Sequence, residues 1–203
     1  RNVSKGNLVG HQYTAKIDLL PFGNFKSDGD YVGNDIEREK KPKLLVGVAY
    51  DYNNDSVKTR GNTGNYMETT TGFFKTDIKS LFVNSHFKYM GLSFMGEYAS
   101  RTSDDAISKN SDGSLTGDIV NDGSAINFQI GYVTPSNVAL TTRFTNIKFK
   151  DIMYPKNDTE QLTIGLSKYF VKHKLKIQSD LTSEKSMNNK NKIFYRLQFE
   201  IHF

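Results

Sequence analysis

The strongest constraint on the fold is an alternation of apolar and mainly polar residues along the last eleven positions of the chain. Successive side chains of a β-strand point to opposite faces of a sheet, so a period of two predicts a strand with one apolar face and one polar face. The apolar set is Ile193, Tyr195, Leu197, Phe199, Ile201 and Phe203.

The same alternation recurs upstream, and we count about nine strands in all. Sixteen Gly, four Pro and an even spread of Phe and Tyr favour many strands joined by polar turns over helices. The chain is therefore predicted to be all-β. The other eight strands are expected near residues 13–19, 44–52, 81–89, 92–101, 126–132, 138–145, 161–167 and 174–182.

The connections between these strands alternate between short and long. Placing all short turns at one end and all long loops at the other is typical of an outer-membrane barrel, and strands of about ten residues match a tilted bilayer span. The segment 21–42 breaks this rule, because it is long yet falls on the short-turn side, and we expect it to carry local structure of its own. The short turns are 90–91, 135–137 and 171–173, and the long loops are 53–72, 102–122, 148–160 and 184–190.

A soluble β-sandwich also alternates apolar and polar residues, so it remains an alternative. Its loops do not sort by length, however, and the polar faces here carry many charged residues suited to lining water. A mean hydropathy of −0.56, with no run of about 20 apolar residues, excludes a helical membrane protein.

Composition excludes several kinds of function. Without cysteine there is no disulfide scaffold, thiolate metal site or cysteine nucleophile. The net charge of +5 is spread among interspersed acids and bases, which argues against nucleic acid as a partner. No pattern indicates a catalytic set, a metal site or a cofactor, so an enzyme is not expected.

Several stretches, taken in order along the chain, resemble the C-terminal half of the phosphate-selective porin O/P family, most closely its Bacteroidetes branch. The most specific are "FKYMGLSFMGEYASRT" and "EQLTIGLSKYFVKHKLKIQSDLTSEK", and the others are "YTAKIDLLPFGNF", "DIEREKKPKLLVGVAYDYNN", "INFQIGYVTPSNVALTTRFTNI" and "RLQFEIHF". The alternating strand that ends in a terminal Phe also resembles an outer-membrane assembly signal, formed here by Tyr195, Leu197, Phe199, Ile201 and Phe203.

The resemblance implies that residues 1–203 form one partial transmembrane β-barrel domain, with about nine C-terminal strands of a barrel of about 16. The family's folded-in constriction loop would then lie in the half outside this chain. A self-contained barrel of eight to ten strands is the alternative. The implied location is the outer membrane of a Gram-negative bacterium. The implied partners are membrane lipid and the barrel assembly machinery, and the protein could also form a homo-oligomer or belong to a larger membrane complex.

The implied function is that of a porin: passive diffusion of small hydrophilic solutes or ions through a water-filled channel, with a mild preference for anions or phosphate. Inward-facing cations would attract the anions, although each could instead pair with a neighbouring carboxylate. Two alternatives remain, a non-conducting accessory subunit of a larger membrane complex and a soluble glycan-binding sandwich. The candidate cations are Lys16, Arg101, Arg143, Lys174, Lys176 and Arg196.

Overall fold

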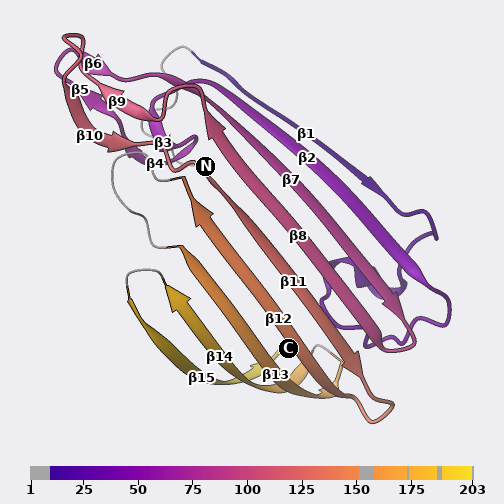
Figure 1. Ribbon diagram of the computed structural model, residues 1–203. Helices are drawn as coiled ribbons and strands as arrows, with labels where there is room; N and C mark the ends of the chain where they lie inside the picture. Colours follow the sequence, from indigo (N-terminus) through magenta and orange to yellow (C-terminus); the bar gives the residue numbers. More distant parts are fainter. Residues whose placement is uncertain (1–9, 151–157, 173, 187–188, 203) are drawn as a thin grey trace.

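Most of the chain forms one antiparallel sheet of nine strands (Figure 1). The computed structural model describes residues 10–150, 158–172, 174–186 and 189–202. Strands adjacent in the sheet follow one another along the chain, apart from short hairpins inserted in two connections. In spatial order the strands are β1 (Gln12–Leu19), β2 (Lys43–Ser56), β7 (Thr76–Tyr89), β8 (Leu92–Ser103), β11 (Gly123–Val133), β12 (Val138–Phe149), β13 (Thr159–Val171), β14 (Leu175–Ser186) and β15 (Asn189–Ile201).

This sheet confirms the all-β prediction, and each of its nine strands contains most of one predicted segment. It is open, because β1 and β15 are its two edges and do not pair with each other. The nine strands by themselves are therefore not a closed barrel. The predicted long loop at 184–190 is wrong, because β14 runs to Ser186 and β15 starts at Asn189.

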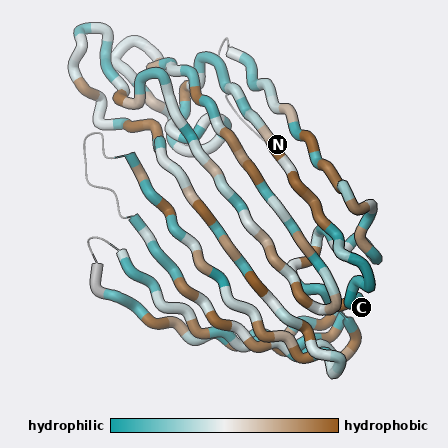
Figure 2. Tube along the Cα trace, turned by 45° about the vertical axis from the view of Figure 1, so that its right-hand side comes forward, coloured by the Kyte–Doolittle hydropathy of each residue, from teal (hydrophilic) through white to brown (hydrophobic). Residues whose placement is uncertain are grey.

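Hydrophobic and hydrophilic residues succeed one another along the strands (Figure 2), and the cross-strand register places residues of like character on the same face, as the alternation predicts. On the apolar face, Phe128, Ile164 and Leu197 are each about half exposed, at 45%, 52% and 53%. No second sheet of comparable size packs over them within the described ranges, since the remaining sheets have two strands each. A sandwich of two large sheets is thus absent from this part of the chain. Nor do the described residues form any helix with the length and apolar character to cross a membrane.

Two long connections, between β2 and β7 and between β8 and β11, fold together into a cap at one end of the sheet (upper left in Figure 1). The amide of Asn121 donates to the carbonyl of Thr59 at 3.0 Å, which ties one connection to the other. The cap holds three hairpins, β3 (Lys58–Arg60) with β4 (Thr63–Tyr66), β5 (Glu68–Thr69) with β6 (Gly72–Phe73), and β9 (Ile107–Lys109) with β10 (Leu115–Ile119).

The cap has a small apolar core of its own. Met67, Ile78 and Val120 are almost fully buried there, and Phe74 and Ala106 pack against them. These connections were predicted to be polar loops, because their apolar residues stand singly among polar ones. Their burial shows that the two connections are parts of one folded unit.

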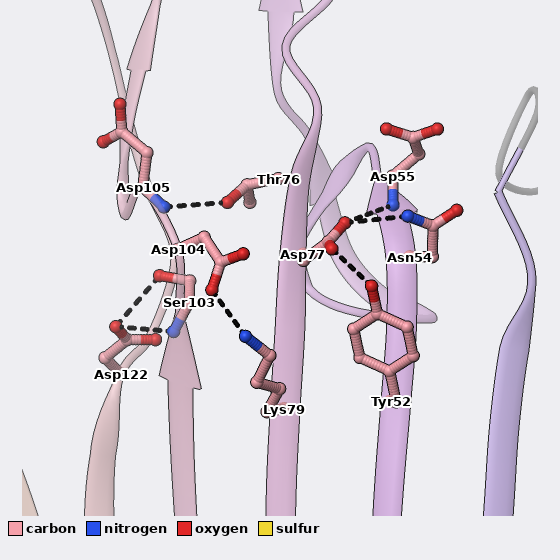
Figure 3. A network of polar contacts seen from close by, with 10 residues as sticks. All are labelled: Tyr52, Asn54, Asp55, Thr76, Asp77, Lys79, Ser103, Asp104, Asp105 and Asp122. Atoms are coloured by element: carbon pink, nitrogen blue, oxygen red, sulfur yellow. Dashed lines mark hydrogen bonds and ion pairs between the residues drawn. The ribbon is translucent and has the colours of Figure 1, made fainter.

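Polar contacts at the base of the cap join the ends of the sheet strands (Figure 3). The carboxylate of Asp77 accepts hydrogen bonds from the Tyr52 hydroxyl, the Asn54 amide and the backbone of Asp55. A carboxylate with several donors is held more firmly than one with a single donor. The upper ends of β2 and β7 are therefore fixed together where the cap begins.

We expect Met67→Ala to destabilise the cap by about 2–5 kcal/mol, because it leaves a cavity in the apolar core. Leu115→Ala is the matched control, since Leu115 lies in the same cap but is 53% exposed. Hydrogen exchange of the cap amides measures the effect. Equal exchange rates in the two variants would contradict a cap held by this core.

Candidate functional site

The connection between β1 and β2, residues 20–42, lies across the polar face of the sheet near its short-turn end. It contains the 3₁₀ helix η1 (Lys26–Tyr31), so the prediction of local structure at 21–42 is confirmed. It covers part of the polar face, whereas the resemblance placed the family's constriction loop in the half outside this chain. We call residues 20–42 the inner segment.

Two buried side chains of β7 hold the start of the inner segment. The Lys88 ammonium group donates to the carbonyl oxygens of Gly29 at 2.7 Å and Asn34 at 2.9 Å. The His86 ring lies 3.2 Å and 3.3 Å from the carbonyl oxygens of Asp30 and Gly33. Both side chains are at least 95% buried, at 2% and 5% exposed, so these contacts take the place of water.

Asp35 holds the second half of the inner segment. Its carboxylate is 1% exposed and accepts the backbone amides of Glu39, at 3.0 and 3.1 Å, and of Gly91, at 2.7 Å. Arg38 donates to the carbonyl oxygen of Val133 in β11. A buried carboxylate is stable only when its oxygens are satisfied, so the inner segment and the β7–β8 turn depend on each other.

Asn34 is the centre of the contact between the inner segment and strands β8, β12 and β13. Its side chain hydrogen bonds with the hydroxyl groups of Ser93, Thr141 and Tyr169. The backbone of β11 passes directly beneath it at Gly131, where a Cβ atom would overlap the Asn34 oxygen. Glycine at this position therefore allows the inner segment to approach the sheet closely.

A cavity of about 900 Å³ lies between the inner segment and strands β11 to β15. Its lining is mostly polar, with amide, hydroxyl and charged side chains. Three of the six predicted cations, Arg143, Lys176 and Arg196, line it. These residues were predicted from the alternation, and the sheet brings them into one site.

Ion pairs occupy three of the six predicted cations. Lys176 pairs with Glu200 at 2.8 Å, and Arg196 pairs with Asp180 at 2.9 Å. Lys16 lies on β1, away from the cavity, and pairs with Asp18 at 2.8 Å. The alternative that neighbouring carboxylates pair with these cations is thus confirmed for all three.

Arg143 and Arg101 have no hydrogen-bond or ion-pair partner in the described part of the chain. Arg143 is half-buried, and its cross-strand neighbours Gln129 and Thr163 are neutral.

Lys174 was predicted to point inward from a strand, but it lies in the exposed turn before β14, so that placement is wrong. The strand begins one residue later because the carbonyl of Val171 and the amide of Lys174 close the turn.

The residues of the suggested assembly signal lie on the outer edge strand, β15. Tyr195, Leu197, Phe199 and Ile201 are 53–66% exposed on the apolar face. Phe203 lies outside the described residues. Their role in assembly stays a prediction.

Two acidic residues at the base of the cap each have a different partner. Asp104 pairs with Lys79 at 2.8 Å, and Asp122 accepts the amide and hydroxyl of Ser103 (Figure 3). No group of three or more His, Asp or Glu within the described ranges is arranged to hold a metal ion.

One cap carboxylate also shows a shifted pKa. In the β9–β10 turn, the hydroxyl and the backbone amide of Ser114 donate to Asp112 and lower the pKa of its carboxyl. Hydrogen bonds to the charged form favour that form, so Asp112 stays ionised to a lower pH than an ordinary aspartate.

We expect Asp35→Ala to release the inner segment from the sheet, because it leaves the buried amides of Glu39 and Gly91 without their acceptor. A hydrogen bond to a charged group is worth about 1.5–3 kcal/mol, so trypsin cleavage at Arg38 should become about tenfold faster or more. Asp28→Ala, an exposed change in the same segment, is the control. Unchanged cleavage in the Asp35 variant would show that other contacts hold the segment.

The comparisons with known proteins do not identify a relative. No protein-family model, no curated protein and no solved structure matches this chain. The resemblance to a porin family therefore stays a prediction.

Proposed function

We propose that the nine strands form part of the wall of a transmembrane β-barrel in a Gram-negative outer membrane, and that the barrel is a porin. Its polar face would line a water-filled channel for small hydrophilic solutes, with a mild preference for anions. The observation that carries this proposal is an apolar face that runs along the whole sheet while its opposite face is polar and charged.

An exposed apolar face of this extent needs a partner. Soluble monomers rarely expose a continuous apolar patch larger than a few hundred Å². Eight of the nine strands have 11–14 residues, which is long enough for a tilted bilayer crossing. Lipid as the partner accounts for both facts. Exposed apolar residues of this face include Tyr13, Ile17, Val48, Tyr50, Phe94, Tyr98, Ile130, Tyr132, Leu140, Leu166, Leu181 and Phe199.

The polar face supports the channel. Its side chains carry both signs of charge, and the cavity beside the inner segment is lined by hydrophilic groups. Passage of small solutes needs such a lining and no nucleophile or cofactor. The inner segment would narrow this channel on its short-turn side.

The open edges of the sheet support a larger assembly. An unpaired edge strand exposes a row of amide and carbonyl groups, which cannot face the hydrocarbon of a bilayer. Within a membrane, β1 and β15 would therefore have to pair with further strands until the barrel closes. The family resemblance implies about 16 strands in total.

The protein reconstituted in a planar bilayer should show stepwise conductance. A protein that binds lipid but gives no conductance would instead be an accessory subunit.

Arg143→Glu combined with Lys176→Glu should move the reversal potential in a salt gradient toward the value expected for a cation-selective channel. At about 0.15 M salt the Debye length is about 8 Å, so the shift should be mild and conductance should stay within about twofold. An unchanged ion preference would remove the anion part of the proposal.

Leu197→Arg should destabilise the assembled protein by about 2–4 kcal/mol if Leu197 lies near the bilayer midplane. Gln198→Arg introduces the same residue one position later, on the polar face, and should leave assembly nearly unchanged. Folding into detergent micelles or vesicles, followed by urea titration, measures both. Equal destabilisation by the two changes would argue against a lipid-facing apolar side.

A further inference from the structure

The cavity beside the inner segment has the size and the lining of a ligand site. Its volume of about 900 Å³ lies within the range of about 300–1,000 Å³ that is usual for small-molecule pockets. It is bounded by five strands on one side and by residues 31–34 of the inner segment on the other. The wall formed by the inner segment is anchored to the sheet, since Asn34 hydrogen bonds with β8, β12 and β13.

Neutral hydrogen-bonding groups make up most of this lining. Gln129, Gln178 and Gln198 contribute amide groups from three different strands, and Thr141 and Ser167 contribute hydroxyl groups. Amides and hydroxyls each offer both a donor and an acceptor. Such a surface matches a ligand whose own groups also donate and accept, as the hydroxyl groups of a sugar do.

Among the described residues that line the cavity, one cation is free to take an anionic group. Lys176 and Arg196 are occupied by their carboxylate partners, whereas Arg143 has no partner in the described part of the chain. Arg143 is flanked by Gln129 and Thr163, its cross-strand neighbours. Its planar guanidinium group suits a carboxylate, which it can bind through two parallel hydrogen bonds.

An exposed aromatic ring completes the site. Tyr31 lies at the end of η1, lines the cavity and is 87% exposed. A ring with so little contact to its own protein presents a free apolar face, against which the C–H face of a sugar ring can pack.

We propose that this cavity binds a hexuronate, a sugar ring that carries one carboxylate. The carboxylate lies on Arg143, the ring hydroxyls lie on the amide and hydroxyl groups, and the ring face lies on Tyr31. This inference rests on the proposed channel and names the solute class for which the channel is selective. Inorganic phosphate is less suited, because it uses few of the neutral groups and its greater negative charge is repelled more strongly by the carboxylate of Asp180, which lines the cavity.

Titration calorimetry of the full-length protein in detergent with galacturonate, galactose and phosphate tests the proposal. Galacturonate should bind about tenfold more tightly than either of the others, because a charge-assisted pair is added to the contacts that galactose makes. Arg143→Gln should remove this advantage, so that galacturonate binds no more tightly than galactose. Arg143→Lys should retain only part of the advantage of galacturonate over galactose, since an ammonium group lacks the planar pair of N–H donors that a guanidinium group offers to a carboxylate.

Lys16→Gln is the matched control, because it removes one cation from the polar face outside the cavity. It should leave galacturonate binding unchanged. Equal binding of galacturonate and galactose, tighter binding of phosphate, no binding at all, or an Arg143→Gln variant that retains the advantage would each overturn the hexuronate site.

Bilayer conductance distinguishes failure of the hexuronate proposal from failure of the porin proposal. If the wild-type protein conducts but shows no preference for galacturonate, the inference fails and the porin proposal stands. If it binds galacturonate with the Arg143 dependence but gives no conductance, the binding site stands and the porin proposal fails.

Discussion

The rest of the structure depends on a sheet with one apolar face that the described chain leaves uncovered. In most soluble folds, the apolar face of a sheet is buried against a second layer. Here the buried apolar residues form only small clusters near the two ends of the strands, such as Met67 with Ile78 and Val133 with Ala139. The middle of the sheet is held by its backbone ladders, and its apolar side chains are available for an outside partner.

The strands and their faces could be predicted because they follow from a local rule. A period of two assigns each side chain to a face without knowledge of its neighbours, so Phe128 and Leu197 were assigned to the apolar side before any contact was known. The path of the inner segment could not be predicted in this way. Asn34 contacts Tyr169, which lies 135 positions further along the chain, and nothing near Asn34 in the sequence indicates that contact.

Cross-strand register explains which cations of the site are paired. Asp180 lies directly opposite Arg196, and Lys176 lies opposite Glu200, in the β14–β15 pair. Opposite charges at such positions attract each other, so these pairs form as soon as the two strands align. Arg143 has only neutral residues opposite it, which leaves it unpaired. The sequence showed that carboxylates were present, but only the register shows which cation each carboxylate pairs with.

The position of the inner segment would increase the effect of Arg143 on which solutes pass. The segment is anchored on β7, the β7–β8 turn and β11 through Lys88, Asp35 and Arg38, and it covers the polar face beside the short turns. In a closed barrel, solutes would therefore be confined to the space left beside the segment, which includes the cavity over β11 to β15. Arg143 lines that space as its only cation without a partner among the described residues. A single unpaired charge can then influence which solutes pass, even where most of the neighbouring charges cancel.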